Sequence, residues 1–104
     1  MKESMIERSL IESMRARGGF TRKVVYQGRK GSPDRWCFFP EGGLLILELK
    51  RPGEKPDPQQ RSELKKLRAA GQYVAWISSC EEVEEVLQDF QLRSFVSFSD
   101  RWVL

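Results

Sequence analysis

The stretch Asp34–Lys50 reads DRWCFFPEGGLLILELK and contains two apolar segments separated by a proline and two glycines. Residues 34–39 and 44–50 each have the length and apolar content of a β-strand, and residues 40–43 have the composition of a tight turn. The stretch therefore predicts an antiparallel hairpin. Because the second segment is almost continuously apolar, we expect its strand to be buried.

Three charged side chains lie at the open end of this predicted hairpin. Side chains alternate between the two faces of a strand, so Glu48 and Lys50 project from the same face. If the hairpin folds about Glu41-Gly42, Asp34 lies opposite Leu49, one residue from Glu48. A carboxylate pair can hold Mg²⁺, and a lysine beside the ion can orient a water or stabilise the charge on a phosphate. The pattern is typical of metal-assisted phosphodiester cleavage.

Each of these residues also has a purely structural interpretation. Asp34 follows Pro33, and a Pro-Asp pair is common in turns. Lys50 could be only the ion-pair partner of Glu48. However, Glu48 interrupts an apolar strand, where an unpaired carboxylate is costly. This position favours a functional role for the Glu48–Lys50 pair.

Two further polar residues lie on the packing faces of predicted helices. Residues 2–17 carry apolar residues at helical spacing, and Glu7 lies on the same side as these residues. Residues 57–70 predict a second helix, and the spacing of Gln60 to the later leucines puts it on the packing face. Glu7 could complete a metal shell directly or through water, and Gln60 could position a water or contact the lysine. Ordinary helix-surface roles are about equally compatible with both residues.

The composition limits the possible classes of protein. A chain of 104 residues with 39% hydrophobic and 11% aromatic residues predicts one globular domain over residues 1–104. The absence of histidine excludes Ser-His and Cys-His catalytic triads and histidine metal sites. No apolar run is long enough to span a bilayer and no signal peptide opens the sequence, so we expect no membrane partner and a cytoplasmic location, bacterial or in a virus-infected host cell.

The charge distribution favours a polyanionic partner. The net charge is +3, and seven basic residues lie between positions 15 and 35. Arg29, Lys30 and Arg35 flank the acids of the hairpin and are candidates for contact with DNA phosphates, although ordinary solvated charge is an alternative interpretation. Cys37 and Cys80 have neither zinc nor redox spacing and are expected to be buried free thiols.

The order of predicted elements is α-β-β-β-α-β-α-β. The fold class is therefore α/β or α+β, with a mixed sheet whose strand–helix–strand crossover is parallel. Residues 73–77 are apolar throughout and are expected to form a central strand. The C-terminal aromatic residues could add a last strand to the core or form a dimer interface. The expected strands are 20–26, 34–39, 44–50, 73–77 and 94–103, and the expected helices are 2–17, 57–70 and 81–90.

The candidate site residues also follow one another in an order and spacing that match a known family of nucleases. The run Lys30-Gly31-Ser32-Pro33-Asp34, followed by Glu48-Leu49-Lys50, Gln60 and a closing Gly71, resembles the VRR-NUC domain, a branch of the PD-(D/E)XK restriction-endonuclease-like nucleases. The resemblance implies a mixed central β-sheet flanked by helices and a DNA endonuclease that depends on Mg²⁺ or Mn²⁺.

The resemblance also implies a role for each matching position. Asp34 and Glu48 would be metal ligands, with the backbone carbonyl of Leu49 as a third oxygen ligand. Lys50 would be the catalytic lysine, and Gln60 would be the glutamine of the family's helix. The same comparison would make Glu7, on the first helix, a further acid at the metal.

Short stand-alone domains of this kind resemble virus-type members, and this implies a homodimer that acts on branched DNA such as four-way (Holliday) junctions or flaps. Two other interpretations remain open. One is a non-catalytic DNA-binding module that retains the nuclease fold, and the other is a structural assembly domain whose carboxylates are held in ion pairs.

Overall fold

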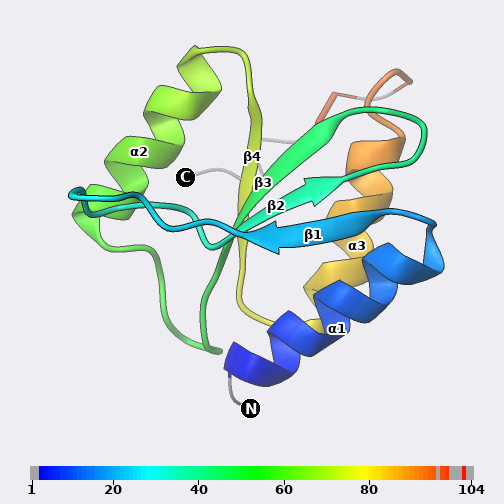
Figure 1. Cartoon of the computed structure of the whole chain (residues 1–104), viewed down its shortest axis with the longest axis horizontal. Helices are drawn as coiled ribbons and strands as arrows, with labels where there is room; N and C mark the ends of the chain where they lie inside the picture. Colours follow the sequence, from blue (N-terminus) through cyan, green and yellow to red (C-terminus); the bar gives the residue numbers. More distant parts are fainter. Residues whose placement is uncertain (1–2, 96, 99–101, 103–104) are drawn as a thin grey trace.

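A mixed four-stranded sheet organises the computed structural model, which describes residues 3–95, 97–98 and 102 (Figure 1). The strand order is β1-β2-β3-β4; the first two pairings are antiparallel, and β3 and β4 are parallel. The predicted α+β fold with flanking helices is confirmed. In chain order the elements are α1 (Glu3–Ala16), β1 (Phe20–Lys23), β2 (Arg35–Phe38), β3 (Leu44–Leu49), α2 (Pro58–Ala69), β4 (Tyr73–Ile77) and α3 (Cys80–Gln91).

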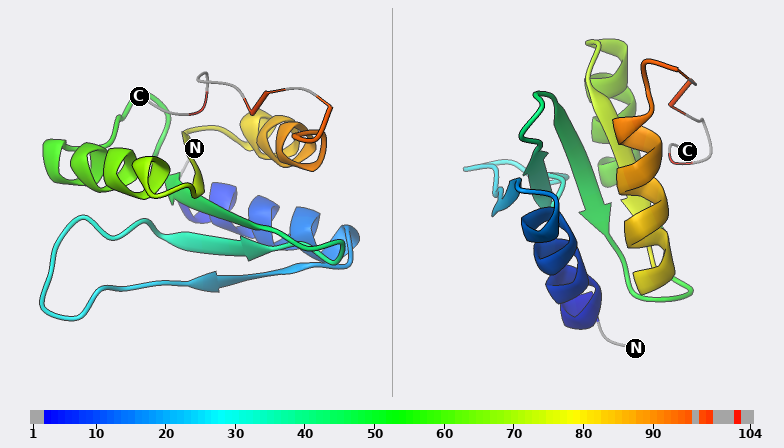
Figure 2. Two further views of the ribbon diagram at one scale, coloured as in Figure 1. Left: turned by 90° about the horizontal axis from the view of Figure 1, so that it is seen from above. Right: turned by 90° about the vertical axis from the view of Figure 1, so that its right-hand side faces the viewer.

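The helices cover both faces of the sheet and create two apolar cores. Helices α1 and α3 pack on one face and form the larger core, to which β3 contributes Leu45, Leu47 and Leu49. Helix α2 packs on the other face against a smaller core that includes Ile46 (Figure 2). Strand β3 is therefore buried on both sides, which explains its continuous apolar sequence. Alternation along the strand turns Glu48 toward the α2 face.

The prediction that residues 73–77 form a central strand is wrong. Strand β4 pairs with β3 alone and lies at an edge of the described sheet. Its apolar sequence has another cause, because both of its faces are covered. Ala75 and Ile77 belong to the larger core, whereas Val74 and Trp76 belong to the smaller one. The apolar sequence of β4 therefore arises because both faces of the strand are buried, and not because it has a neighbouring strand on each side.

The β2–β3 hairpin forms as predicted, with a register one residue away from the expected one. The strands pair Arg35 with Leu47. One residue further out, Asp34 is level with Glu48 rather than with Leu49. The difference arises because the connection contains an odd number of residues, 39–43, and is centred on Glu41.

The C-terminal residues that the structure describes complete the core instead of adding a strand. Residues 94–95 form a turn and residues 97–98 have no regular structure; the remainder of the predicted strand lies outside the described residues. Trp102 is 1% exposed, and its Nε1 donates to Asp89 Oδ2 at 2.7 Å. Phe98 packs against the larger core, whereas Phe95 is exposed.

Two smaller predictions have different outcomes. Cys37 is a fully buried free thiol, as predicted, but Cys80 is only half-buried because it is the first residue of α3. None of the helices in the described ranges is long and apolar enough to cross a membrane.

Candidate active site

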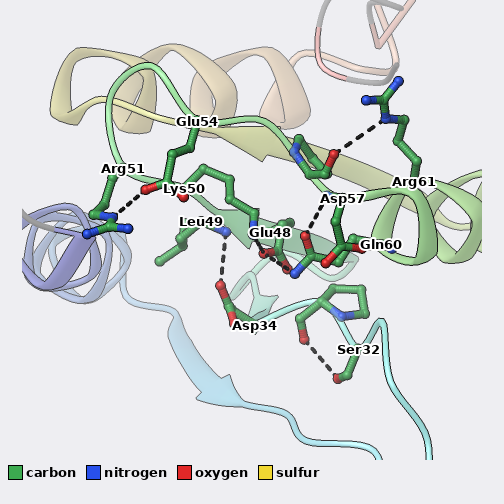
Figure 3. Close-up of polar contacts among 12 residues, drawn as sticks. Ser32, Asp34, Glu48, Leu49, Lys50, Arg51, Glu54, Asp57, Gln60 and Arg61 are labelled. Atoms are coloured by element: carbon green, nitrogen blue, oxygen red, sulfur yellow. Dashed lines mark hydrogen bonds and ion pairs between the residues drawn. The ribbon is translucent and has the colours of Figure 1, made fainter.

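Four of the predicted residues meet where β3 leaves the sheet (Figure 3). Asp34 immediately precedes β2, Glu48 lies in β3, and Lys50 directly follows β3. Gln60 reaches the same place from the first turn of α2. The hairpin register brings Asp34 level with Glu48, and the crossover through α2 adds Gln60 from the covering layer.

The carboxylate of Glu48 is at the centre of this cluster and is almost completely buried, with the residue 2% exposed. Its Oε2 lies 3.2 Å from Lys50 Nζ and accepts a hydrogen bond from Gln60 Nε2 at 3.0 Å. Its Oε1 is also buried and accepts no hydrogen bond within the described part of the chain. Buried carboxylate oxygens normally have a partner, so this oxygen has an unused capacity to bind a cation or a donor.

Asp34 is tied to the neighbouring strand through its side chain. Its Oδ2 accepts a hydrogen bond from the Leu49 N–H at 3.2 Å. Its backbone carbonyl accepts another from the Val24 N–H at 2.9 Å, which continues the β1–β2 ladder by one step. These two bonds hold the half-buried carboxyl group across the open end of the hairpin.

The environment makes negative charge at this site unfavourable without a cation. Burial raises the pKa of Glu48 from its ordinary value of 4.5 to about 7, and the neighbouring charge of Asp34 adds to the rise, while Lys50 opposes it. Burial also raises the pKa of Asp34. A divalent cation between the two carboxylates would favour their ionised forms.

The side chain of Gln60 is held from two sides. Asp57 is the N-cap of α2, and its Oδ1 accepts from the Gln60 N–H at 2.8 Å. In return Gln60 Oε1 accepts from the Asp57 N–H at 2.9 Å, which completes a capping box. The amide oxygen is thereby occupied, and the amide nitrogen points to Glu48. The pattern Asp57-x-x-Gln60 is a recognisable capping-box signal in the sequence, and it could have predicted this contact between the N-cap and Gln60.

The donor chemistry of the site suits magnesium or manganese. The described residues contain no group of three or more His, Cys, Asp or Glu side chains that could enclose a metal. The two carboxylates Asp34 and Glu48 match the usual Mg²⁺ site, in which one or two carboxylates act together with waters and phosphate oxygens. The unpartnered Oε1 of Glu48 is a hard oxygen of the required kind.

Glu7 and Arg35 contact each other instead of joining the cluster. Arg35 Nη2 lies 2.9 Å from Glu7 Oε2, and the arginine side chain is only 11% exposed. Arg35 projects on the face of β2 that α1 covers, because it alternates with Trp36, which packs in the smaller core. Glu7 influences the site only as a nearby charge that raises the pKa of Asp34 slightly, the smallest of five contributions.

The loop between β1 and β2 contacts α2 through Tyr26 and Arg29, which both reach Glu63; of these three residues, the sequence pattern indicated only Arg29. Arg29 Nη2 lies 3.6 Å from Glu63 Oε1, and the Tyr26 hydroxyl donates to Glu63 Oε2 at 2.6 Å. Lys30 is exposed beside them. Tyr26 and Glu63 are 37 positions apart in the sequence. No local pattern around either residue indicated that they are in contact.

The fold and the cluster together define a restriction-endonuclease-like nuclease domain, and two comparisons specify the family. The chain is 40% identical over 79 residues to "Putative nuclease p44" of Acyrthosiphon pisum secondary endosymbiont phage 1, a match that covers 76% of this chain and 85% of the phage protein. A solved VRR_NUC domain matches with a TM-score of 0.78 and 32% identity, over 83% of this chain and 94% of that one. No family model matches the chain. The chain belongs to the VRR-NUC family.

Proposed function

We propose that this protein is a single-domain, metal-dependent deoxyribonuclease that hydrolyses phosphodiester bonds within DNA. The observation that carries the proposal is the buried carboxylate of Glu48, which has one oxygen shared by Lys50 and Gln60 and the other without a partner in the described structure. An apolar strand gains no stability from such a group. The presence of Glu48 in this strand is explained if its Oε1 binds a metal ion when the protein functions.

Asp34 and Glu48 would hold Mg²⁺ or Mn²⁺, with the Leu49 carbonyl as a further ligand implied by the family. When bound, the ion supplies Lewis-acid polarisation of the phosphate and neutralises charge. Glu7, which is paired with Arg35, is a weaker candidate for the metal shell than the sequence implied.

The other polar groups would act on the phosphate and the attacking water. Lys50 carries its ammonium group beside Glu48, where it can orient a water and stabilise the negative charge that grows on the phosphate. Gln60 keeps the Glu48 carboxylate in one orientation. Attack in line with the scissile bond would leave a 5′-phosphate and a 3′-hydroxyl, by analogy with the family.

Three finer features complete the proposal. We propose branched DNA, such as four-way junctions or flaps, as the substrate, and a homodimer as the active form, because a two-fold dimer presents two sites to paired backbones. Arg29 and Lys30 would contact phosphates beside the site. DNA as the substrate points to a cytoplasmic location in a bacterium or an infected host cell.

The test is a cleavage panel of labelled flap, splayed, four-way and duplex DNA, with Mn²⁺, with Mg²⁺ and with chelator. We expect metal-dependent cleavage that Asp34→Asn and Glu48→Gln abolish. Glu84→Gln is the matched control, because it removes an acid whose only ion pair in the described structure, with Arg17, is on the surface. Sedimentation at micromolar concentration tests the dimer, and a purely monomeric protein would contradict it.

The Glu48–Lys50 ion pair also suits a second candidate, a DNA-binding module that keeps the nuclease fold without turnover. The same panel separates the two. DNA binding without cleavage in either metal would support the binding module and refute the nuclease.

A further inference from the structure

A groove lies between the β1–β2 loop and α2, next to the proposed cleavage site. Two adjoining cavities of about 390 and 260 Å³ form it, and they share Arg29, Lys30 and Gln59 in their linings. The groove reaches Asp34 at one end and Glu63 at the other. In Figure 1 the loop, coloured cyan, extends from the strands to the beginning of α2.

Glu63 holds the loop against the helix with both carboxylate oxygens. One oxygen accepts the Tyr26 hydroxyl at 2.6 Å, and the other is 3.6 Å from the Arg29 guanidinium. The side chain of Glu63 is only 11% exposed, so these partners replace much of its water. Burial and the adjacent carboxylate raise the pKa of Tyr26 to about 12, and the phenol therefore remains a donor.

Close backbone packing adds to this attachment. Gly31 has a φ of +93°, and a Cβ at this position would lie 3.1 Å from the Gln59 carbonyl oxygen. Ser32 Oγ donates to the Val24 carbonyl at 3.2 Å and joins the two arms of the loop. The loop is thus fixed to α2 by specific contacts and gives the groove a defined shape.

The groove presents basic side chains beside three acids that also line it: Asp34, which belongs to the proposed metal site, the N-cap residue Asp57, and Glu63. Lys23 and Lys30 line it and form no ion pair within the described ranges. The Arg29 side chain is 60% exposed despite its contact with Glu63. Ammonium groups in a groove that leads to a nuclease site are suited to phosphate oxygens.

The size of the groove limits what can enter it. Cavities of about 300–1,000 Å³ hold small ligands; the cavity of about 390 Å³ falls at the lower end of this range, and the cavity of about 260 Å³ lies just below it. Neither cavity is large enough to enclose a duplex, whose major groove alone is about 12 Å wide. We propose that this groove binds the sugar–phosphate backbone of one unpaired DNA strand beside the bond that is cut, which among the proposed branched substrates favours a flap, and that Glu63 is a positioning residue that holds the outer wall of the groove.

This inference rests on the proposed function, but its test does not require turnover. Binding of labelled poly(dT) is measured by fluorescence anisotropy in chelator over a series of salt concentrations, with a blunt duplex of equal length as the second probe. We expect tighter binding of the single strand. Lys23→Ala and Lys30→Ala should each weaken it by about threefold to tenfold and make the slope of log K against log[salt] less steep by about 0.7.

Lys66→Ala is the matched control, because Lys66 is an exposed lysine of α2 that does not line the groove. Equal effects of Lys66→Ala and Lys30→Ala, unchanged slopes, or tighter binding of the duplex would each overturn the proposal. If the single-strand results are as expected but no DNA is cleaved in Mn²⁺, the groove stands as a binding site and only the nuclease proposal fails.

The positioning role is tested with Tyr26→Phe and Glu63→Gln. Tyr26→Phe should lower poly(dT) affinity and speed hydrogen exchange in residues 24–33, whereas Tyr73→Phe, at a tyrosine outside the groove, should do neither. Glu63→Gln removes a negative charge, which by itself would raise affinity for DNA. Lower affinity with faster exchange in the loop would support positioning, and higher affinity with unchanged exchange would refute it.

Discussion

Gln60 links the beginning of α2 to the buried carboxylate of Glu48. Its side-chain oxygen is occupied by the Asp57 N–H, and its nitrogen donates to Glu48 Oε2 at 3.0 Å. Because the cap determines which end of the amide faces the strand, the helix start and the orientation of the carboxylate are coupled. Removing the cap should therefore affect chemistry as well as stability.

Asp57→Ala should lower the free energy of unfolding by about 1 kcal/mol through loss of the N-cap and should also reduce cleavage. Ser79→Ala provides the comparison, because Ser79 caps α3 through its bond to the Glu82 N–H, away from the site. We expect a similar loss of stability in urea unfolding but no loss of cleavage. Equal cleavage rates for the two variants would contradict the coupling.

The raised pKa of Glu48 predicts a pH dependence of stability in the absence of metal. Between about pH 4.5 and pH 7, Glu48 is protonated in the folded protein and ionised in the unfolded chain. The folded state binds more protons in this window, so the free energy of unfolding falls as the pH rises. The total effect is on the order of 3 kcal/mol, and the raised pKa of Asp34 acts in the same direction.

Urea unfolding of the wild type and Glu48→Gln, in chelator between pH 4 and pH 8, isolates this contribution. The free energy of unfolding of the wild type, relative to that of Glu48→Gln, should decrease as the pH rises from about 4.5 to about 7. Parallel pH profiles of the two proteins would show that the carboxyl group titrates normally. Divalent ions should bind more tightly as Glu48 ionises, and calorimetry can follow this change.

Lys50→Ala should reduce cleavage by at least about 100-fold, because the ammonium group beside Glu48 is lost from the place where phosphate charge develops. DNA binding should change little, since the groove lysines remain. Lys55→Ala, which removes an exposed lysine of the nearby crossover, is the matched control. Undiminished cleavage by Lys50→Ala would refute a catalytic role for the lysine.

Two glycines of the β1–β2 loop offer a matched test of how the loop contacts α2. Gly28 and Gly31 both have positive φ, at +70° and +93°, but only at Gly31 would a Cβ approach another segment, the Gln59 backbone. Both alanine variants should lose about 1 kcal/mol of stability from backbone strain. Gly31→Ala should lose more and should also weaken single-strand binding. Equal losses in thermal unfolding and binding assays would show that this contact is not needed.

Local patterns in the sequence predicted most of the framework and most of the central cluster. The alternation Glu48-x-Lys50 and the hairpin turn were enough to bring Asp34 to the same end of the sheet. The helical spacing between Gln60 and the later leucines was enough to predict that Gln60 lies on the face of α2 that packs against the sheet. These relationships depend on short-range geometry, which the sequence encodes directly.

The failures concern contacts between distant segments. The pairing of Glu7 with Arg35 depends on how α1 crosses the sheet, and the contact between Tyr26 and Glu63 depends on where a loop folds back. The edge position of β4 was missed because burial by helices gives the same apolar run as burial between strands. None of these relationships leaves a periodic signal in the chain.

The turn between β2 and β3 lies at the opposite end of the hairpin from the cluster. Opening the chain between Glu41 and Gly42 would leave Asp34 on one fragment and Glu48, Lys50 and Gln60 on the other. Neither fragment alone would carry both carboxylates, so ion binding and cutting would return only when the halves reassociate across the β2–β3 ladder. The protein is therefore suited to fragment complementation, with DNA scission as the reporter of association.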